Sequence, residues 1–250
     1  MIKNIFSGIK AYGDSLKLVN TLGLWKYFGI PMIISLLTAI AVGFSAWGFS
    51  DDIGMLISNI WIWEWGSETF KTLSDLIGLL IILAFGLIVY KHIVLALSAP
   101  FMSLVSEKIE AHILGNDPIK NNVFKWSLLW RGLRINVRNL LLELFLTIPI
   151  LLIGFIPVIG LISTILLFLV QAYYAGFGNM DYTLERHLSY KQSIQFVKNH
   201  KGTAIGNGII FMLMLLIPVI GIIFVLPLSV TAASTETIKI VLNTEKKHVL

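Results

Sequence analysis

The sequence predicts an all-α membrane protein, because apolar residues dominate it and long stretches carry no charge. Hydrophobic residues make up 56% of the 250 residues and charged residues only 13%, against roughly 25% charged in soluble domains. The mean hydropathy is +0.84. We expect one integral membrane domain over residues 1–250, with two long transmembrane helices, two re-entrant (partly penetrating) helical hairpins and interfacial amphipathic helices.

The amino-terminal segment is expected to lie in the headgroup layer. Residues 1–26 place apolar side chains at helical spacing, and Lys3, Lys10 and Lys17 recur every seven residues. This pattern is typical of an amphipathic interfacial helix. The charge-free run 27–50 follows, and it is long enough to cross a hydrocarbon core of about 30 Å. It is the first predicted transmembrane helix.

A second transmembrane helix is predicted for residues 76–100. Its charge-free part, 76–90, is too short alone. We therefore expect the helix to continue past Lys91, with that side chain snorkelling to the interface. Pro100 is expected to begin a new helix, because proline fits a first turn better than a helix interior.

Residues 101–142 are expected to form cytoplasmic or interfacial helices. Gly115-Asn116 is a stop signal, and Asp117-Pro118 is a start signal for the next helix. One face of that helix is basic, a pattern that more often indicates headgroup contact than a substrate site. The residues of this face are Arg131, Arg134 and Arg138.

The stretches 144–180 and 202–235 contain no Asp, Glu, Lys or Arg, and the same pentapeptide, Ile-Pro-Val-Ile-Gly, interrupts both. Cut at these turns, most of the legs are short, and segments of about 10–14 apolar residues are more often re-entrant than spanning. We therefore predict two re-entrant hairpins. Their tips are Pro157, Gly160, Pro218 and Gly221.

A helix begins after each of these prolines, and a helix N-terminus carries about half a positive charge. Two such ends at membrane depth would form a spot that favours anions. The alternative is a tight apolar turn whose N–H groups are satisfied locally. The repeated pentapeptide hints at internal duplication, and chance repetition in an Ile-rich segment explains it as well.

The charge distribution predicts that both termini face the cytoplasm. Lysines precede the first predicted span, acidic residues dominate the loop 51–75, and nearly all other Lys and Arg follow the second span. Positive segments stay inside, which places the loop outside with Trp61, Trp63 and Trp65 as interfacial anchors. The net charge of +5 is thus a topology signal, and no nucleic-acid partner is expected.

Few residues have the chemistry of a functional site. Gly23, Leu24, Trp25 and Lys26 stand just before the first span, where Lys26 could meet an anion beside free backbone N–H groups. The more common alternative is an interfacial lysine that extends its ammonium group into the headgroup layer and binds no substrate. Glu107 and Glu110 are expected as solvated or intersubunit charges, and residues 181–187 as a capped turn that closes the first hairpin.

The sequence contains no motif that is typical of an enzyme active site. The chain has no Cys, its histidines lack metal spacing, and it contains no nucleophile elbow or P-loop. We expect no catalytic residues, no metal and no cofactor. The glycines Gly202, Gly206 and Gly208 open a membrane leg, which predicts close helix packing and not dinucleotide binding.

An ordered set of segments resembles the CysZ sulfate permeases and their wider relatives, the etoposide-induced-protein group. None is diagnostic alone, but they keep the family's order over nearly the whole chain. They are Leu16–Asn20 with Gly23 and Pro31, Ser98–Glu110, Ile156–Gly160, Met180–Tyr182, Ile217–Gly221 and Leu226–Ala233.

The resemblance implies an oligomeric bacterial inner-membrane protein that passes sulfate inward for cysteine synthesis without a cofactor. The family's anion site is a Gly followed by a basic pair before the first span. The matching positions here are Gly23, Trp25 and Lys26, so one arginine is lost and the other becomes lysine, which lacks the bidentate fork. Glu107 and Glu110 match family carboxylates of the pore or of subunit contacts.

The leading hypothesis is a sulfate or related oxyanion channel or permease in contact with membrane lipids. The alternative is a non-transporting membrane scaffold or bilayer-shaping protein of the same fold, which the weakened basic pair favours.

Overall fold

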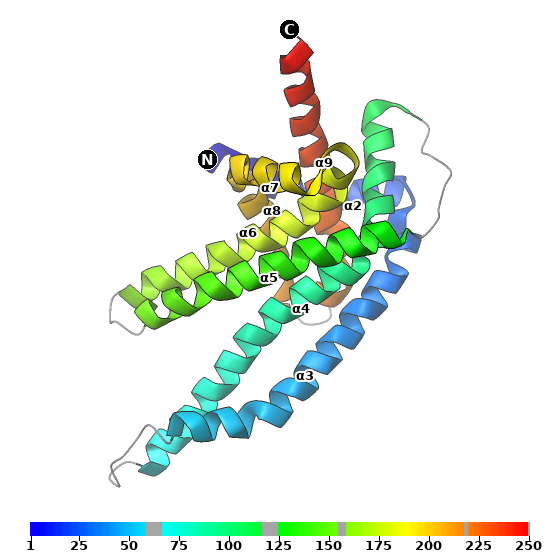
Figure 1. Ribbon diagram of the computed structural model, residues 1–250. Helices are drawn as coiled ribbons and strands as arrows, with labels where there is room; N and C mark the ends of the chain where they lie inside the picture. Colours follow the sequence, from blue (N-terminus) through cyan, green and yellow to red (C-terminus); the bar gives the residue numbers. More distant parts are fainter. Residues whose placement is uncertain (59–66, 117–124, 155–158, 218–219, 250) are drawn as a thin grey trace.

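The computed structural model describes residues 1–58, 67–116, 125–154, 159–217 and 220–249. Within these ranges the chain forms helices and no strand (Figure 1), which confirms the all-α fold class. Both termini lie at the same end of the molecule. The helices are α1 (Ile2–Lys10), α2 (Ser15–Thr21), the 3-10 helix η1 (Leu24–Tyr27), α3 (Gly29–Ser58), α4 (Ser67–Leu114), α5 (Trp126–Gly154), α6 (Ile159–His187), α7 (Tyr190–Asn199), α8 (Lys201–Leu215) and α9 (Ile220–Val249).

The amino-terminal segment forms two helices, so the expectation of one continuous interfacial helix was wrong. The break between α1 and α2 lets α1 pack on α8 while Val19 of α2 is buried in the main core. Tyr12, in the break, donates a hydrogen bond to the Asn207 carbonyl at 2.8 Å. Desolvation raises the pKa of Tyr12 well above its usual value, which keeps the phenol protonated.

Helices α3 and α4 form a hairpin that covers both predicted transmembrane segments. The expectation that a new helix begins at Pro100 was wrong, because α4 is one helix of 48 residues that continues through this proline. Gly132 of α5 lies against this turn, where an added Cβ would be 3.2 Å from the Ala96 carbonyl oxygen that Pro100 cannot bond. Packing by a neighbouring helix makes such a proline tolerable in a membrane helix.

The predicted stop after α4 is confirmed. Gly115 has φ +68°, a left-handed conformation that glycine adopts without a Cβ penalty. The Asn116 N–H donates to the Ala111 carbonyl at 2.9 Å, which satisfies one of the last free carbonyls of the helix. The predicted start at Asp117-Pro118 and the three loop tryptophans, Trp61, Trp63 and Trp65, lie outside the described residues.

The first hairpin is built from longer helices than the charge pattern indicated. Helices α5 and α6 have 29 residues each, and the expected boundary between 101–142 and 144–180 falls inside α5. Residues 181–187 belong to α6 and are not a capped turn. Glu143 and Asp181 do not end these helices, because each carboxylate is paired with a basic side chain of another helix.

In the second hairpin, α8 has 15 residues and α9 has 30. The expected leg 222–235 is therefore only part of α9. Five segments are long and apolar enough to cross a membrane, within the described part of the chain: Gly29–Phe49, Phe85–Leu114, Trp126–Gly154, Gly160–His187 and Ile223–Thr244. Leg length thus no longer favours re-entrance, and the re-entrant course stays a prediction.

Glycines bring α8 into backbone contact with two neighbours, which confirms the predicted close packing. A Cβ added at Gly202 would lie 2.7 Å from the Met1 carbonyl oxygen, and Gly206 faces the Ile5 backbone of α1 in the same way. On the other side, Gly208 of α8 lies against the Ala172 carbonyl of α6, and Gly176 of α6 lies against Ala204 of α8. This is the small-residue packing of membrane helices.

Large apolar side chains cover the outside of the long helices as well as the core. Exposed examples on α3, α5 and α6 are Leu37, Phe44, Trp47, Phe145, Leu152, Leu161 and Ile165. An apolar surface of this extent indicates contact with lipid or with other protein.

Candidate functional site

The predicted anion-site residues form a tight turn at the entrance to α3. Gly23 has φ +58° and ψ +39°, and this left-handed conformation explains the glycine. Leu24 is fully buried in the main core and anchors the turn. Lys26 is exposed.

Trp25 is held in one orientation. Its indole N–H donates to Asn20 Oδ1 at 2.6 Å, and its ring meets Phe28 and Phe224 edge-on at centroid distances of 6.3 and 5.8 Å. Phe224 lies in the second turn of α9, so the structure brings the Gly23 turn close to the beginning of α9.

Two ammonium groups from different segments converge on one ring beside this turn. Lys26 Nζ and Lys108 Nζ each lie 5.4 Å from the centroid of Tyr27. Lys108 belongs to the last part of α4, far from Lys26 in the chain. Sequence reasoning missed it, because nothing in a linear pattern places α4 next to η1.

The hairpin tips are described only in part. Pro157 and Pro218 lie outside the described residues. Gly160 lies in the first turn of α6, where an added Cβ would be 2.7 Å from the Gly154 carbonyl oxygen. Gly221 lies in the first turn of α9, close to Met214, and donates its N–H to the Ile217 carbonyl at 2.8 Å. Both glycines therefore permit a narrow turn.

Glu110 forms ion pairs within the chain. Its Oε2 lies 2.7 Å from Arg186 Nη2, and its Oε1 lies 2.7 Å from His187 Nε2. Glu107, three residues earlier on α4, is half-buried. The participation of either residue in a pore or a subunit contact stays a prediction.

A buried ionic cluster joins α4 and α5, and sequence reasoning missed it. Lys91 is fully buried and lies 2.6 Å from Glu143 Oε1, so the expectation that it snorkels was wrong. Lys91 also donates to the Gln171 carbonyl of α6 at 3.2 Å. His92 Nε2 lies 2.9 Å from Glu143 Oε2. The available signal was the Lys91-His92 pair inside an apolar run, because ionisable residues in membrane helices are usually paired.

The second nitrogen of His92 also faces an oxygen. Nδ1 lies 3.3 Å from Asn136 Oδ1, and the Asn136 amide nitrogen is committed to the Gly132 carbonyl at 2.9 Å. His92 of α4 therefore lies between two residues of α5, Glu143 and Asn136, and adds a second link between these helices.

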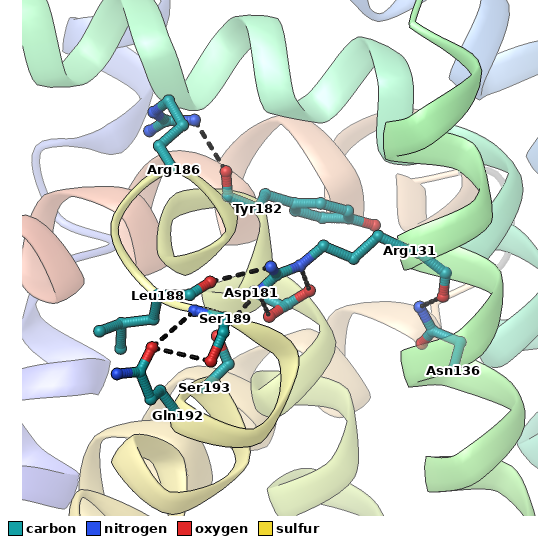
Figure 2. A network of polar contacts seen from close by, with 10 residues as sticks. Arg131, Asn136, Asp181, Tyr182, Arg186, Leu188, Ser189, Gln192 and Ser193 are labelled. Carbon is teal, nitrogen blue, oxygen red and sulfur yellow. Dashed lines mark hydrogen bonds and ion pairs between the residues drawn. The ribbon is translucent and has the colours of Figure 1, made fainter.

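Arg131 ties α5 to α6 and to the following turn, as Figure 2 shows. Its Nε and Nη2 lie 3.2 and 3.0 Å from the two carboxylate oxygens of Asp181. Nη1 donates to the Leu188 carbonyl at 2.9 Å, and Nη2 also donates to Ser193 Oγ at 2.8 Å. The expected headgroup contact was wrong for Arg131, because its guanidinium is used inside the protein.

The other two arginines of that row also have partners within the chain. Arg134 stacks on the Tyr190 ring with its Cζ 4.1 Å from the centroid. Arg138 donates to Asn139 Oδ1 at 2.9 Å. Arg134 thus contacts α7 and Arg138 lies over the Phe177 ring of α6, while headgroup contact by these two arginines stays a prediction.

We expect Arg131→Ala to lower the free energy of unfolding by about 3 kcal/mol, because it leaves the buried Asp181 carboxylate unpaired. Arg131→Lys should lose less, since it keeps the charge but not the two-pronged geometry. Thermal unfolding in detergent measures both. Lys198→Ala, at an exposed position on α7, is the matched control, and equal stability of all three variants would contradict this role.

The chemistry that the region of the Gly23 turn offers is the positive charge of two ammonium groups. Among the described residues, no group of three or more His, Asp or Glu could hold a metal ion. Lys26 and Lys108 beside the Gly23 turn form no ion pair within the described residues, whereas the buried Lys91 is paired with Glu143.

Comparison with known proteins gives the family. The family model described as Sulfate transporter CysZ/Etoposide-induced protein 2.4 matches residues 11–225. A protein named sulfate transporter CysZ from Pseudomonas aeruginosa (strain LESB58) is 26% identical over 234 residues, which cover 91% of this chain and 93% of the relative. Another of that name, from Pseudomonas fluorescens (strain Pf0-1), is 25% identical over 239 residues, 92% of each.

These matches confirm the resemblance that the ordered motifs indicated. The family is one of transporters and not of enzymes, which agrees with the lack of a catalytic motif. Because the family model matches most of the sequence, the chain belongs to the Sulfate transporter CysZ/Etoposide-induced protein 2.4 family.

Proposed function

We propose that this protein is a bacterial inner-membrane transporter of sulfate or a related oxyanion, a channel or permease that supplies sulfate for cysteine biosynthesis. The observation that carries the proposal is the convergence of Lys26 and Lys108 beside the Gly23 turn, in a chain whose relatives are named sulfate transporters.

The anion-binding residues are Gly23, Leu24, Trp25 and Lys26. Leu24 and the hydrogen-bonded Trp25 fix the turn, and Lys26 supplies its ammonium group. Family members have a basic pair here, and this chain has Trp25 in the first position. Lys108 supplies the second cation from α4 instead, close enough to share the Tyr27 ring with Lys26.

The contact between Trp25 and Phe224 supports a shallow second hairpin. Trp25 lies in η1, just before the first candidate spanning segment, Gly29–Phe49. Phe224 is about one turn, or about 5.4 Å, beyond the beginning of α9. The turn between α8 and α9 then lies near the level of Trp25 and penetrates the bilayer only partly. Both termini are cytoplasmic in this arrangement, as the charge distribution predicts.

We also propose that the protein is a homo-oligomer. Turn backbone within a membrane must be buried in protein or line water, and the exposed apolar faces of α5 and α6 can contact lipid or a neighbouring subunit. Glu107 and Glu110 lie at the end of α4 near Lys108, and they would line the pore or a subunit contact there.

Sulfate uptake by liposomes containing the purified protein tests the function. We expect uptake above empty liposomes, and Lys26→Gln should lower the rate at low sulfate by about tenfold, the effect of one charge-assisted hydrogen bond of roughly 1.5 kcal/mol. Lys191→Gln, exposed on α7, is the charge-matched control.

Uptake equal to that of empty liposomes would reject sulfate transport. If the assembled oligomer then had a dry, lipid-filled axis, the non-transporting membrane scaffold would be the better account. Uptake of a panel of oxyanions and halides, measured for the parent and for Lys26→Gln, would identify the transported ion.

A further inference from the structure

A cavity of about 480 Å³, with several charged and hydroxyl side chains in its lining, lies between α1, α2, the end of α4 and α9. Helices α1 and α2 form one wall, the end of α4 another, and α9 the third. Its ionisable lining residues are Lys10, Asp14, Lys17, His112, Glu236 and Lys239. This cavity includes none of the residues of the Gly23 turn.

The charges of the cavity do not cancel. Glu236 is already neutralised, because Lys239 Nζ lies 2.9 Å from its Oε1 and Ser7 donates to its Oε2 at 2.5 Å. Lys10 and Lys17 are exposed, and neither has an ion pair within the described part of the chain. Asp14 is left as the single carboxylate facing two free ammonium groups, so the cavity attracts small anions.

The cavity adjoins the proposed anion site. His112 lies one helical turn beyond Lys108 on α4, and positions four residues apart share a helix face. Thr21 lines the cavity as well, two residues before Gly23. Lysines therefore lie on both sides of His112, with Lys26 and Lys108 at the Gly23 turn and Lys17 and Lys10 in the cavity.

We infer that this cavity is a second anion-binding site, a vestibule that collects or releases the transported oxyanion at the cytoplasmic end. The inference rests on the proposed function. Its ligand is a doubly charged inorganic oxyanion, and the phosphate of an anionic lipid headgroup is the competing source of the same chemistry. The vestibule raises the local anion concentration next to Lys26 and Lys108.

Equilibrium binding of radiolabelled sulfate to the protein in nanodiscs of zwitterionic lipid tests the site without transport. Lys10→Gln/Lys17→Gln should weaken binding at one of two sites by about tenfold, from two partly screened charges of roughly 0.7 kcal/mol each, and leave the second site intact. Lys26→Gln should weaken the other. Lys3→Gln is the matched control. Lys3 belongs to the same seven-residue repeat as Lys10 and Lys17, but it does not line the cavity.

In liposomes, the double variant should raise the half-saturating sulfate concentration and reduce the dependence of the rate on ionic strength, with the saturated rate unchanged. Lys10→Arg/Lys17→Arg should behave as the parent does. A purely structural role for these lysines would instead lower the melting temperature and leave the salt dependence unchanged, and that result would overturn the inference.

Two further outcomes would also overturn it. One is equal sulfate binding by the parent and the double variant. The other is an effect of the double variant that occurs only with anionic lipid, which would assign the cavity to headgroups. If sulfate bound in the cavity but no flux occurred, the proposed function would fail while the second site stood.

Discussion

Replacing Glu143 with alanine is expected to lower the free energy of unfolding by about 3–5 kcal/mol, the usual effect of removing one partner from a buried ion pair. Glu143 accepts from both Lys91 and His92, and all three side chains are buried almost completely. Its loss leaves Lys91 in the protein interior with no carboxylate partner. Unfolding in detergent, followed by size-exclusion chromatography at rising temperature, measures the effect.

A double substitution separates pairing from packing. Lys91→Met/Glu143→Leu removes both charges and keeps similar volume, so it should be more stable than Glu143→Ala, although His92 then lacks one acceptor. Asp52→Ala, at an exposed position on α3, should leave the melting temperature unchanged. If Glu143→Ala melted with the parent, the cluster would not stabilise the fold.

Gly208→Leu is expected to have the second large effect, about 3 kcal/mol or more, because overpacking of a tight interface forces backbones apart. Even a Cβ at Gly208 would overlap the Ala172 carbonyl of α6. Helices α6 and α8 would have to separate, and the close approach at Gly176 would be lost with them. The yield of monodisperse protein and its melting temperature in detergent report the change.

Gly48→Ala provides the opposite control. Nothing lies within 4 Å of a Cβ built at Gly48 of α3, and alanine is the better helix former by roughly 1 kcal/mol. The variant should be as stable as the parent or more so. Destabilisation by both substitutions to the same degree would mean that glycines are needed for some reason other than helix contact.

Patterns confined to one segment allowed correct predictions. The apolar run before Ser50 indicated α3, Gly115 indicated the end of α4, and the spacing of Gly202, Gly206 and Gly208 indicated close packing. Each depends on local backbone geometry or on the face of one helix, so a single sequence contains the necessary information.

Predictions that took a charged residue to end a helix or to face the membrane surface were wrong for Lys91, Arg131, Glu143 and Asp181. The absence of charge served to delimit membrane helices, and α5 and α6 therefore seemed to be cut short at Glu143 and Asp181. Both carboxylates have basic partners on another helix, Lys91 and Arg131. A charged residue with such a partner can lie inside a membrane helix, so it does not indicate where the helix ends. The partner lies too far away in sequence to be recognised from spacing.

The candidate site follows the same division. The Gly23 turn was predictable, because glycine before a basic residue and an apolar run is a local signal. Lys108 and the cavity beside it were not, because they depend on how the end of α4 packs against α2, η1 and α9.

The uninterrupted course of α4 has a mechanical consequence. At 1.5 Å per residue, its 48 residues have a contour length of about 72 Å, more than twice the thickness of the hydrocarbon layer. The helix bends along the way, and Figure 1 shows its carboxyl-terminal part turned away from the part that packs on α3. Pro100, with its missing backbone donor, is the place where such a bend is easiest, so a tilt of the α3–α4 hairpin need not displace His112 at the vestibule by the same amount.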